Sequence, residues 1–200
     1  TAFASLASLT ELKALICWHQ GWQREPTMTG SGLASLVSLP HLSRLILAGS
    51  RITDAAIDAI VQIKSLQELE IFHCWKLSDA ALLRLAELPD LRHLSVGSVR
   101  SEPKGSEGVH VSDAFVRVLS NMSTLESLSL SEGILTYEGS LKALKNLPAL
   151  KKIELSEVAL PPGDFEKLRA DLPGIAIKYT SPKEKLAARL NELRTAEAAK

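Results

Sequence analysis

The 200-residue sequence has little of several features that mark particular classes of protein. Its two cysteines, Cys17 and Cys74, are too few for a disulfide framework, and they do not stand in a paired metal-ligand spacing. Lysine plus arginine and aspartate plus glutamate each total 23, so no net positive charge is available to gather phosphates or anionic lipid. We therefore expect no nucleic-acid partner, no metal site and no cofactor.

Long apolar stretches are also missing. The charge-free stretch 26–43 is rich in Ser, Thr, Gly and Pro, and it could not cross a hydrocarbon core. The first residues show no basic region followed by an apolar one, although a chain that starts at Thr1 without Met could have lost such a segment. The sequence thus predicts no membrane span and leaves the compartment open, with the cytoplasm as the default.

One pattern recurs along the chain, with apolar residues at positions 1, 4 and 6 of a short segment. It occurs six times, and successive starts lie 24 to 34 residues apart. The six segments are 12–17, 42–47, 66–71, 91–96, 125–130 and 150–155. A weaker seventh segment, 175–179, alternates apolar and polar residues as a terminal strand does. The period predicts one strand in every repeat.

A helical pattern follows these strands and starts at a serine or threonine. In Thr53-Asp54 the hydroxyl can accept a first-turn backbone N–H, while the carboxylate favours the positive end of the helix dipole. Prolines at 40, 89 and 148 end three of these helices before the next strand. The predicted helix caps are Thr29, Thr53, Ser78, Ser112 and Thr136.

The block LQELEIFHCWKLSDAALLRLAEL, residues 66–88, resembles the cysteine-containing class of leucine-rich repeats, with Cys74 where that class has Asn or Cys. The Thr-Asp-Ala-Ala helix start is similar to repeats common in bacterial members of the family. This resemblance covers roughly residues 2–179, and it implies an α/β solenoid, or horseshoe, with a parallel concave sheet, convex helices and a protein-recognition role. Stacking gives the same fold, because one strand and one helix cannot bury their own apolar faces.

The solenoid is expected to occupy residues 1–180, with about six full repeats and partial end repeats. Phe3, Leu6 and Leu9 have the spacing of a helix from an incomplete first repeat, whose open edge could support self-association. Residues 181–200 start with a capping-box pattern, Ser-Pro-Lys-Glu, and the sequence leaves open whether this helix caps the solenoid or links it to a further domain.

Two insertions interrupt otherwise regular repeats. Four helix legs, each from the capping residue to the next strand, are 13 residues long. The legs from strand to cap measure 11 or 12 residues in three repeats but 17 and 21 in two others, which places insertions at about 18–28 and 97–110. Both leave the carboxyl ends of strands, so they share one edge, with roots roughly 14 Å apart. Such insertions often mark a binding face, and they can equally be tolerated surface loops.

Residues at positions 3, 5 and 7 of each strand face away from the predicted core. In the N-terminal half this face has exposed apolar side chains, which favour binding of a protein or peptide. The alternative is that the first insertion folds onto Trp18 and Ile16 as a local mini-core. The predicted contact residues are Trp18, Trp22, Arg44, Ile46, Glu68, Glu70, Phe72, His73, Trp75 and His93.

Catalytic interpretations have weaker support. His73 and Cys74 are adjacent, so they point in different directions, and no third orienting group is evident. Glu68 and Glu70 face one side without a closed pocket, and His93, in one row with Arg44 and Glu68, suggests an ion-pair ladder with these two residues. The sequence thus predicts a non-enzymatic binding module with no catalytic residue. The alternative is a targeting or regulatory fragment of a larger multidomain enzyme.

Overall fold

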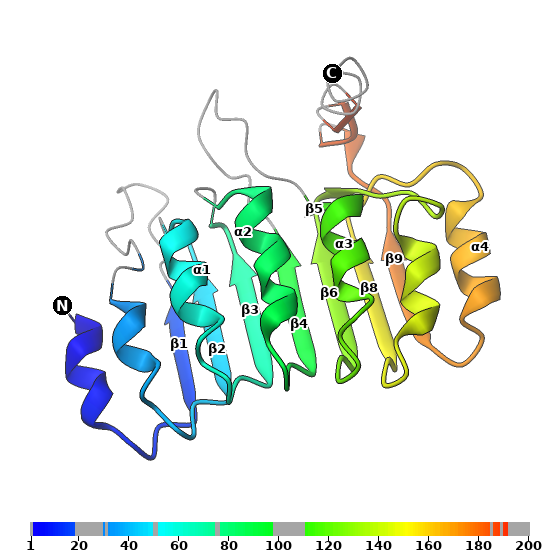
Figure 1. Ribbon diagram of the computed structural model, residues 1–200. Helices are drawn as coiled ribbons and strands as arrows, with labels where there is room; N and C mark the ends of the chain where they lie inside the picture. Colours follow the sequence, from blue (N-terminus) through cyan, green and yellow to red (C-terminus); the bar gives the residue numbers. More distant parts are fainter. Residues whose placement is uncertain are drawn as a thin grey trace.

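The six predicted strands and the weaker seventh form one parallel sheet in which spatial order follows chain order. The computed structural model describes residues 2–18, 30, 32–49, 52–74, 77–97, 111–184, 186–188 and 190–191. Figure 1 shows the strands side by side, with the helices on one side of the sheet. The strands are β1 (Ala14–Trp18), β2 (Arg44–Ala48), β3 (Glu68–Phe72), β4 (His93–Gly97), β6 (Ser127–Ser131), β8 (Lys152–Ser156) and β9 (Ala176–Thr180).

The strand register matches the repeat alignment. Strands β1, β2, β3, β4, β6 and β8 each begin at position 3 of their repeat, and neighbouring strands pair position by position. Leu45, for example, pairs with Leu15 on one side and Leu69 on the other. The periodic leucines are therefore stacked in rows, as a leucine-rich-repeat solenoid requires.

The segments between the strands form short α-helices and 3-10 helices (η), and two of them contribute short strands that pair in parallel. Pro40, Pro89 and Pro148 each follow a helix end, as predicted. No helix in the described ranges is long and apolar enough to cross a membrane. The helices and short strands outside the seven-stranded sheet are η1 (Ala2–Ser8), η2 (Leu33–Leu36), α1 (Asp54–Ile60), α2 (Asp79–Leu83), η3 (Arg84–Glu87), β5 (Val111–Ser112), α3 (Asp113–Leu119), β7 (Gly133–Ile134), η4 (Leu141–Asn146) and α4 (Asp164–Asp171).

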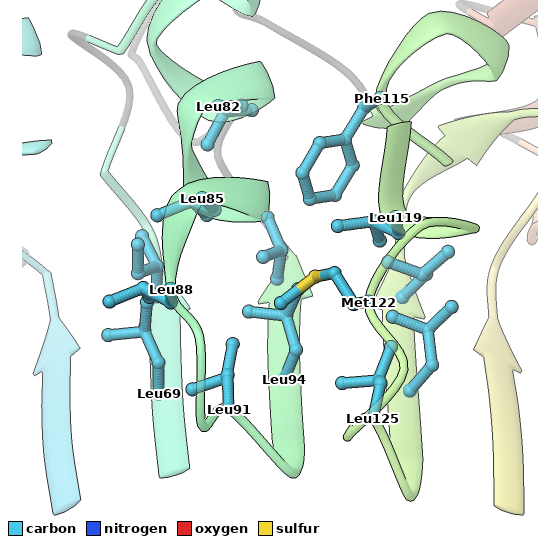
Figure 2. Close-up of a cluster of buried hydrophobic side chains, with 14 of the residues drawn as sticks. Leu69, Leu82, Leu85, Leu88, Leu91, Leu94, Phe115, Leu119, Met122 and Leu125 are labelled. Atoms are coloured by element: carbon cyan, nitrogen blue, oxygen red, sulfur yellow. The ribbon is translucent and has the colours of Figure 1, made fainter. Parts of the chain in front are cut away.

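The core lies between the sheet and the helices and is continuous from one repeat to the next (Figure 2). Leu69 and Leu94 from the strands meet Leu82 and Leu85 from the helical side, and all four are at most 1% exposed. Burying a leucine side chain stabilises the fold by about 1.5–3 kcal/mol. Because these side chains contact the next repeat as well as their own, the repeats stabilise one another.

The inward side chains of the two end strands are less buried than those of the inner strands. Leu15 and Cys17 of β1 are half-buried, whereas Leu45 and Leu47 at the same positions of β2 are completely buried. Burial still raises the pKa of the Cys17 thiol above its ordinary value. At the other end, the N–H of Ala187 donates to the Lys183 carbonyl at 2.8 Å. Whether this last helix is a cap or a linker stays a prediction, as does the domain boundary.

The predicted helix caps are partly correct. Ser78 and Ser112 precede α2 and α3, and their hydroxyls accept first-turn N–H groups at 3.1 and 3.4 Å. Thr53 precedes α1, but its side chain accepts no capping hydrogen bond. Thr136 does not directly precede η4, which begins after Ser140, but its hydroxyl accepts the Gly139 N–H at 2.9 Å and so caps the turn before η4. The predicted Thr136 cap therefore stands before this turn and not directly before the helix, and Thr29 lies outside the described residues.

The aspartates after these caps join one repeat to the next, a role that the sequence analysis did not assign. Asp54 accepts the N–H and the hydroxyl of Ser78 at 2.8 and 2.7 Å. Asp113 accepts the corresponding groups of Thr136 at 2.9 and 2.7 Å, and the hydroxyl of Ser140 at 2.5 Å. Each carboxylate therefore fixes the start of the following helical segment.

Cys74, at the position where the resembled repeats have Asn or Cys, packs in the core and forms hydrogen bonds. Its side chain is completely buried, and its Sγ lies 3.7 Å from the Leu47 carbonyl and 3.1 Å from the Phe72 carbonyl. The thiol thereby bonds to a backbone carbonyl of its own repeat and to one of the preceding repeat, 27 residues earlier in the sequence. This residue belongs to the scaffold of the loop that follows β3.

Candidate functional site

The face of the sheet opposite the helices displays three rows of side chains, at positions 3, 5 and 7 of the strands. Sheet pairing fixes the neighbours in each row: Ile16 pairs with Ile46, and Ile46 pairs with Glu70. Adjacent strands lie about 4.8 Å apart, so side chains in one row are within contact distance of each other. A partner on this face would contact several repeats at once.

Exposed apolar side chains gather at the N-terminal end of this face. Ile16 is 54% exposed and Trp18 is 69% exposed, both on β1. Phe72, at the same position as Trp18 but two strands away on β3, is half-buried. We call Ile16, Trp18 and Phe72 the apolar patch. Water contact with such large apolar groups is unfavourable, which favours a partner that covers them.

Ile46 differs from the prediction, because it is only 7% exposed. It is flanked in register by Ile16 and Glu70. Arg44, two residues earlier on the same face, reaches diagonally to Glu70 with its Nη2 3.5 Å from Oε1. The expectation that Ile46 is exposed was therefore wrong.

The polar residues next to the patch form part of the expected ladder. Arg44 Nε lies 3.0 Å from Glu68 Oε2, so the guanidinium contacts both carboxylates on β3. His93 is exposed and pairs in register with Glu68, but no ion pair joins these two described residues. The predicted ladder therefore covers β2 and β3 and does not extend to β4.

A left-handed residue follows four of the strands. Gly49, His73, Glu132 and Glu157 have φ values of 65°, 53°, 58° and 55°. The N–H groups of Gly49, His73 and Glu132 donate to the carbonyl of the last residue of the neighbouring strand, at 3.0, 3.3 and 3.0 Å. This turn ends the strands at one level, at the edge from which the insertions leave. Only Gly49 gave a signal for it in the sequence.

Parts of the predicted site lie outside the described residues. These are Trp22, Trp75 and almost all of the insertions at 18–28 and 97–110. The mini-core alternative involves the first insertion and thus also falls there. Within the ranges that the structure describes, no group of three or more His, Cys, Asp or Glu residues could hold a metal ion.

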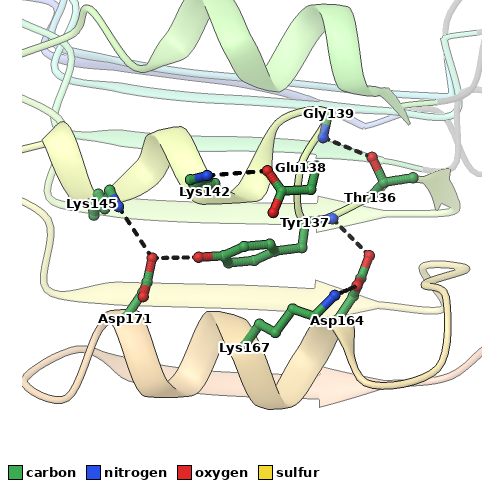
Figure 3. A network of polar contacts seen from close by, with 9 residues as sticks. All are labelled: Thr136, Tyr137, Glu138, Gly139, Lys142, Lys145, Asp164, Lys167 and Asp171. Carbon is green, nitrogen blue, oxygen red and sulfur yellow. Dashed lines mark hydrogen bonds and ion pairs between the residues drawn. The ribbon is translucent and has the colours of Figure 1, made fainter.

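A polar network joins the last repeats on the helical side (Figure 3). The Tyr137 hydroxyl donates to Asp171 Oδ2 at 2.6 Å, and the Tyr137 N–H donates to Asp164 Oδ2 at 2.8 Å. Lys145 and Lys167 lie 3.4 and 3.0 Å from Asp171 and Asp164. The network links η4 and the segment before it to α4, and its matched donors and acceptors indicate a structural role.

The network shifts three pKa values. The hydrogen bond to Asp171 raises the pKa of Tyr137 to about 12, and the same bond lowers the pKa of Asp171. Burial alone would raise the pKa of Asp164, but hydrogen bonds from the Tyr137 N–H and Lys167 outweigh it and lower the pKa. Both aspartates are therefore charged at neutral pH, and the tyrosine is protonated.

Comparison with known proteins finds the fold in solved structures. No protein-family model and no curated protein matches the chain. An internalin C2 from Listeria monocytogenes is similar over 88% of this chain, with a TM-score of 0.61 and 20% identity. An internalin (inlF) from the same organism is similar over 90%, with a TM-score of 0.60 and 22% identity.

The chain spans 65% of the internalin C2 structure and 51% of the inlF structure, that is, about half to two thirds of these proteins. Both are leucine-rich-repeat proteins, and at this identity the likeness shows the fold alone. Together with the register of the parallel sheet, it establishes that this chain is a leucine-rich-repeat solenoid.

Proposed function

From the leucine-rich-repeat fold, we propose that this chain is a non-enzymatic module that binds a protein or peptide on the concave face of its sheet. The observation that carries the proposal is the exposure of Ile16 and Trp18, at 54% and 69%, on a sheet fixed by a continuous core. Repeat solenoids present extended concave surfaces of this kind to their partners. Tryptophan is among the residue types that contribute most to interface energies.

Trp18 and Phe72 are the proposed apolar anchors, and Ile16 extends the surface between β1 and β2. The polar contacts are proposed at the row positions beside them, where side chains are partly or fully accessible. Trp22 and Trp75 are retained from the sequence analysis. The polar residues at row positions are Arg44, Glu68, Glu70 and His93, and His73, directly after β3, is a further proposed contact.

Two other sequence-based expectations stay predictions. One is that the chain is a targeting or regulatory fragment of a larger multidomain enzyme. The other is self-association through the open edge of the first repeat. Neither requires a different fold. The first predicts that a longer protein containing this chain has enzymatic activity, and the second predicts that the molecular mass in solution rises with concentration.

The proposed face can be tested with peptide display. Random peptides of about twelve residues, long enough to cross the sheet when extended, are selected on the immobilised chain. We expect Trp18→Ala and Phe72→Ala to weaken the binding of the selected peptides by about tenfold or more, as substitutions of interface anchors do. Val37→Ala is the matched control, because Val37 is 39% exposed but follows η2 on the helical side.

Thermal melting of the same variants separates the proposal from the mini-core. Trp18→Ala should leave the melting temperature nearly unchanged, since the side chain is mostly exposed. Weaker binding with unchanged melting supports the site. A large drop in melting temperature for Trp18→Ala supports the mini-core, and unchanged binding by both variants contradicts the proposed face.

A further inference from the structure

The concave face carries two groups of charged residues with opposite net charge, separated by small uncharged side chains. Resting on the proposed function, we propose that the partner is a peptide segment that crosses the strands with a basic side chain over β3 and an acidic side chain over β8 and β9. An apolar side chain of this segment lies on the apolar patch. Its order along the face is apolar, basic, neutral, acidic.

The first group, which we call the acidic triad, consists of Arg44, Glu68 and Glu70. One guanidinium lies 3.0 Å from Glu68 and 3.5 Å from Glu70, so a single positive charge is shared by two carboxylates. The formal charge of the triad is therefore negative by one. Both carboxylate side chains remain accessible, at 29% and 26% exposure, and can accept further hydrogen bonds from a cation.

The second group, the basic triad, consists of Lys152, Glu154 and Lys178 on β8 and β9. Lys178 Nζ lies 2.7 Å from Glu154 Oε1, and Lys152 Nζ lies 3.4 Å from Oε2. Two positive charges thus share one carboxylate. Hydrogen bonds from Lys178 first and Lys152 second hold the pKa of Glu154 below its usual range. The triad is formally positive by one, and its lysines are 55% and 68% exposed.

The strands between the triads, β4 and β6, have no carboxylate, lysine or arginine on this face. Apart from His93, their outward residues are serines and Gly97. A Cβ added at Gly97 would lie 2.5 Å from the Ser131 Cβ, so the side chains here can hardly be larger. The outward serines are Ser95, Ser127, Ser129 and Ser131.

The spacing sets the length of the segment. From β3 to β8 are three strand spacings and from β3 to β9 four, about 14 and 19 Å. An extended peptide rises about 3.3 Å per residue, so the basic and acidic residues stand about four to six positions apart. This separation exceeds the screening length of about 8 Å at physiological salt, so each triad interacts with a partner independently of the other. We call the two triads the charged poles of the face.

Charge complementarity of this kind determines partner choice and orientation more than affinity. A uniformly acidic or uniformly basic segment would meet a triad of its own sign at one end. A segment with the charges in the reverse order would meet both, or would move its apolar side chain away from the patch. The face therefore selects one polarity of peptide.

The test uses two substitutions that each neutralise one pole and keep its shortest ion pair. Glu70→Gln leaves the contact between Arg44 and Glu68, and Lys152→Gln leaves the contact between Lys178 and Glu154. Lys142→Gln on the helical side removes the same charge from a residue of similar exposure, 49%, and is the control. The probe is the random peptide library described above.

We expect peptides selected on the unaltered chain to carry lysine or arginine and aspartate or glutamate at this spacing. Each neutralising substitution should reduce the matching charge preference by about twofold to fivefold, the range of exposed ion pairs. Lys142→Gln should change neither. Peptides that depend on Trp18 but show no charge order overturn this inference and leave the proposed function intact. Absence of any enriched peptide contradicts both.

Discussion

The first and last strands of the sheet, β1 and β9, have the same backbone environment but opposite surfaces. Each pairs with one neighbour, and each alternates exposed and half-buried residues in the same pattern. The outward residues of β1 include Ile16 and Trp18, without a charge. Those of β9 include Lys178 and Thr180, which contact Glu154 and Ser156 on β8.

This difference shows that the two faces of the sheet are specified separately. Inward residues set the register and the core, and they occupy equivalent positions in every strand, although those of the two end strands are only half-buried. Outward residues take no part in that packing, so they are free to differ, and an apolar outward residue calls for another explanation. Association with a partner is the explanation proposed for β1, whereas ion pairs within the chain satisfy β9.

The largest expected effect tests the equivalence of the inward rows. Leu69→Ala on β3 and Leu128→Ala on β6 remove completely buried side chains from the two halves, and each should lower the free energy of unfolding by about 2–5 kcal/mol. Urea denaturation followed by circular dichroism measures this loss. Leu9→Ala, at a residue that is 48% exposed, is the control and should cost much less.

The two leucine substitutions should each destabilise the whole chain and not only the repeat that contains them. A continuous core predicts a single transition in both variants, because neighbouring repeats share their buried contacts. Two transitions, with one half surviving after loss of the other, would show that the inward rows are not equivalent.

The next effect concerns the aspartates that join repeats. Asp113→Ala removes the acceptor of three bonds from Thr136 and Ser140, and it should cost about 1–3 kcal/mol. Asp54→Ala removes two bonds to Ser78 at a more exposed place, and it should cost less. Thermal unfolding compares them, with exposed Asp90→Ala as the control. Equal losses for all three variants would refute the inter-repeat role.

A smaller, pH-dependent effect is confined to the C-terminal repeats. Tyr137→Phe removes the bond to Asp171 and should cost about 0.5–1.5 kcal/mol at neutral pH. The folded-state pKa of Tyr137 is raised to about 12, so its contribution is present below the unfolded value of about 10 and is lost as the pH rises through 12.

At acid pH the contribution of the network to stability is lost in the opposite direction, as the pH falls. Because the pKa of Asp171 is lowered, its contribution is present above an unfolded value of about 3.9 and disappears as the pH falls through the folded one. The difference in unfolding free energy between the unaltered chain and Tyr137→Phe, measured by urea titration at each pH, should therefore shrink at both extremes. A constant difference would contradict the network.

The smallest expected effect is on the stability contributed by the outward residues. Ile16→Ser on β1 and Lys178→Gln on β9 should each change the free energy of unfolding by no more than about 0.5–1 kcal/mol, because both side chains are mostly exposed. Ile16→Ser should also weaken binding of the selected peptides through the apolar patch, whereas Lys178→Gln should reduce only their preference for an acidic residue. A stability loss comparable to that of Leu69→Ala would place Ile16 in a core.

The register of the sheet could be predicted because burial repeats at positions 1, 4 and 6, and such a period has one structural solution. The buried positions of Leu69 and Leu94 follow from this period alone. The bonds of Asp113 could not be predicted, because they depend on the turn that brings Thr136 and Ser140 back to it. The same holds for the left-handed φ of His73, for which no glycine gave a signal.

The candidate site was predictable only as positions on a face. Row alignment placed Trp18 and Phe72 correctly at one level of the sheet. It could not give the exposure of Ile46, which is only 7% on the same face. Side-chain contacts between strands decide accessibility, and a linear pattern contains no information about the rotamers that make them.

The exposure of Trp18 is the central claim, and one measurement tests it directly. In a chain with Trp22→Phe and Trp75→Phe, Trp18 is the only tryptophan, and its fluorescence reports on one side chain. We expect a red-shifted emission and efficient quenching by iodide in the folded chain, followed by protection when a selected peptide is added. A blue-shifted emission that resists iodide until the chain unfolds would contradict the exposed patch and the function built on it.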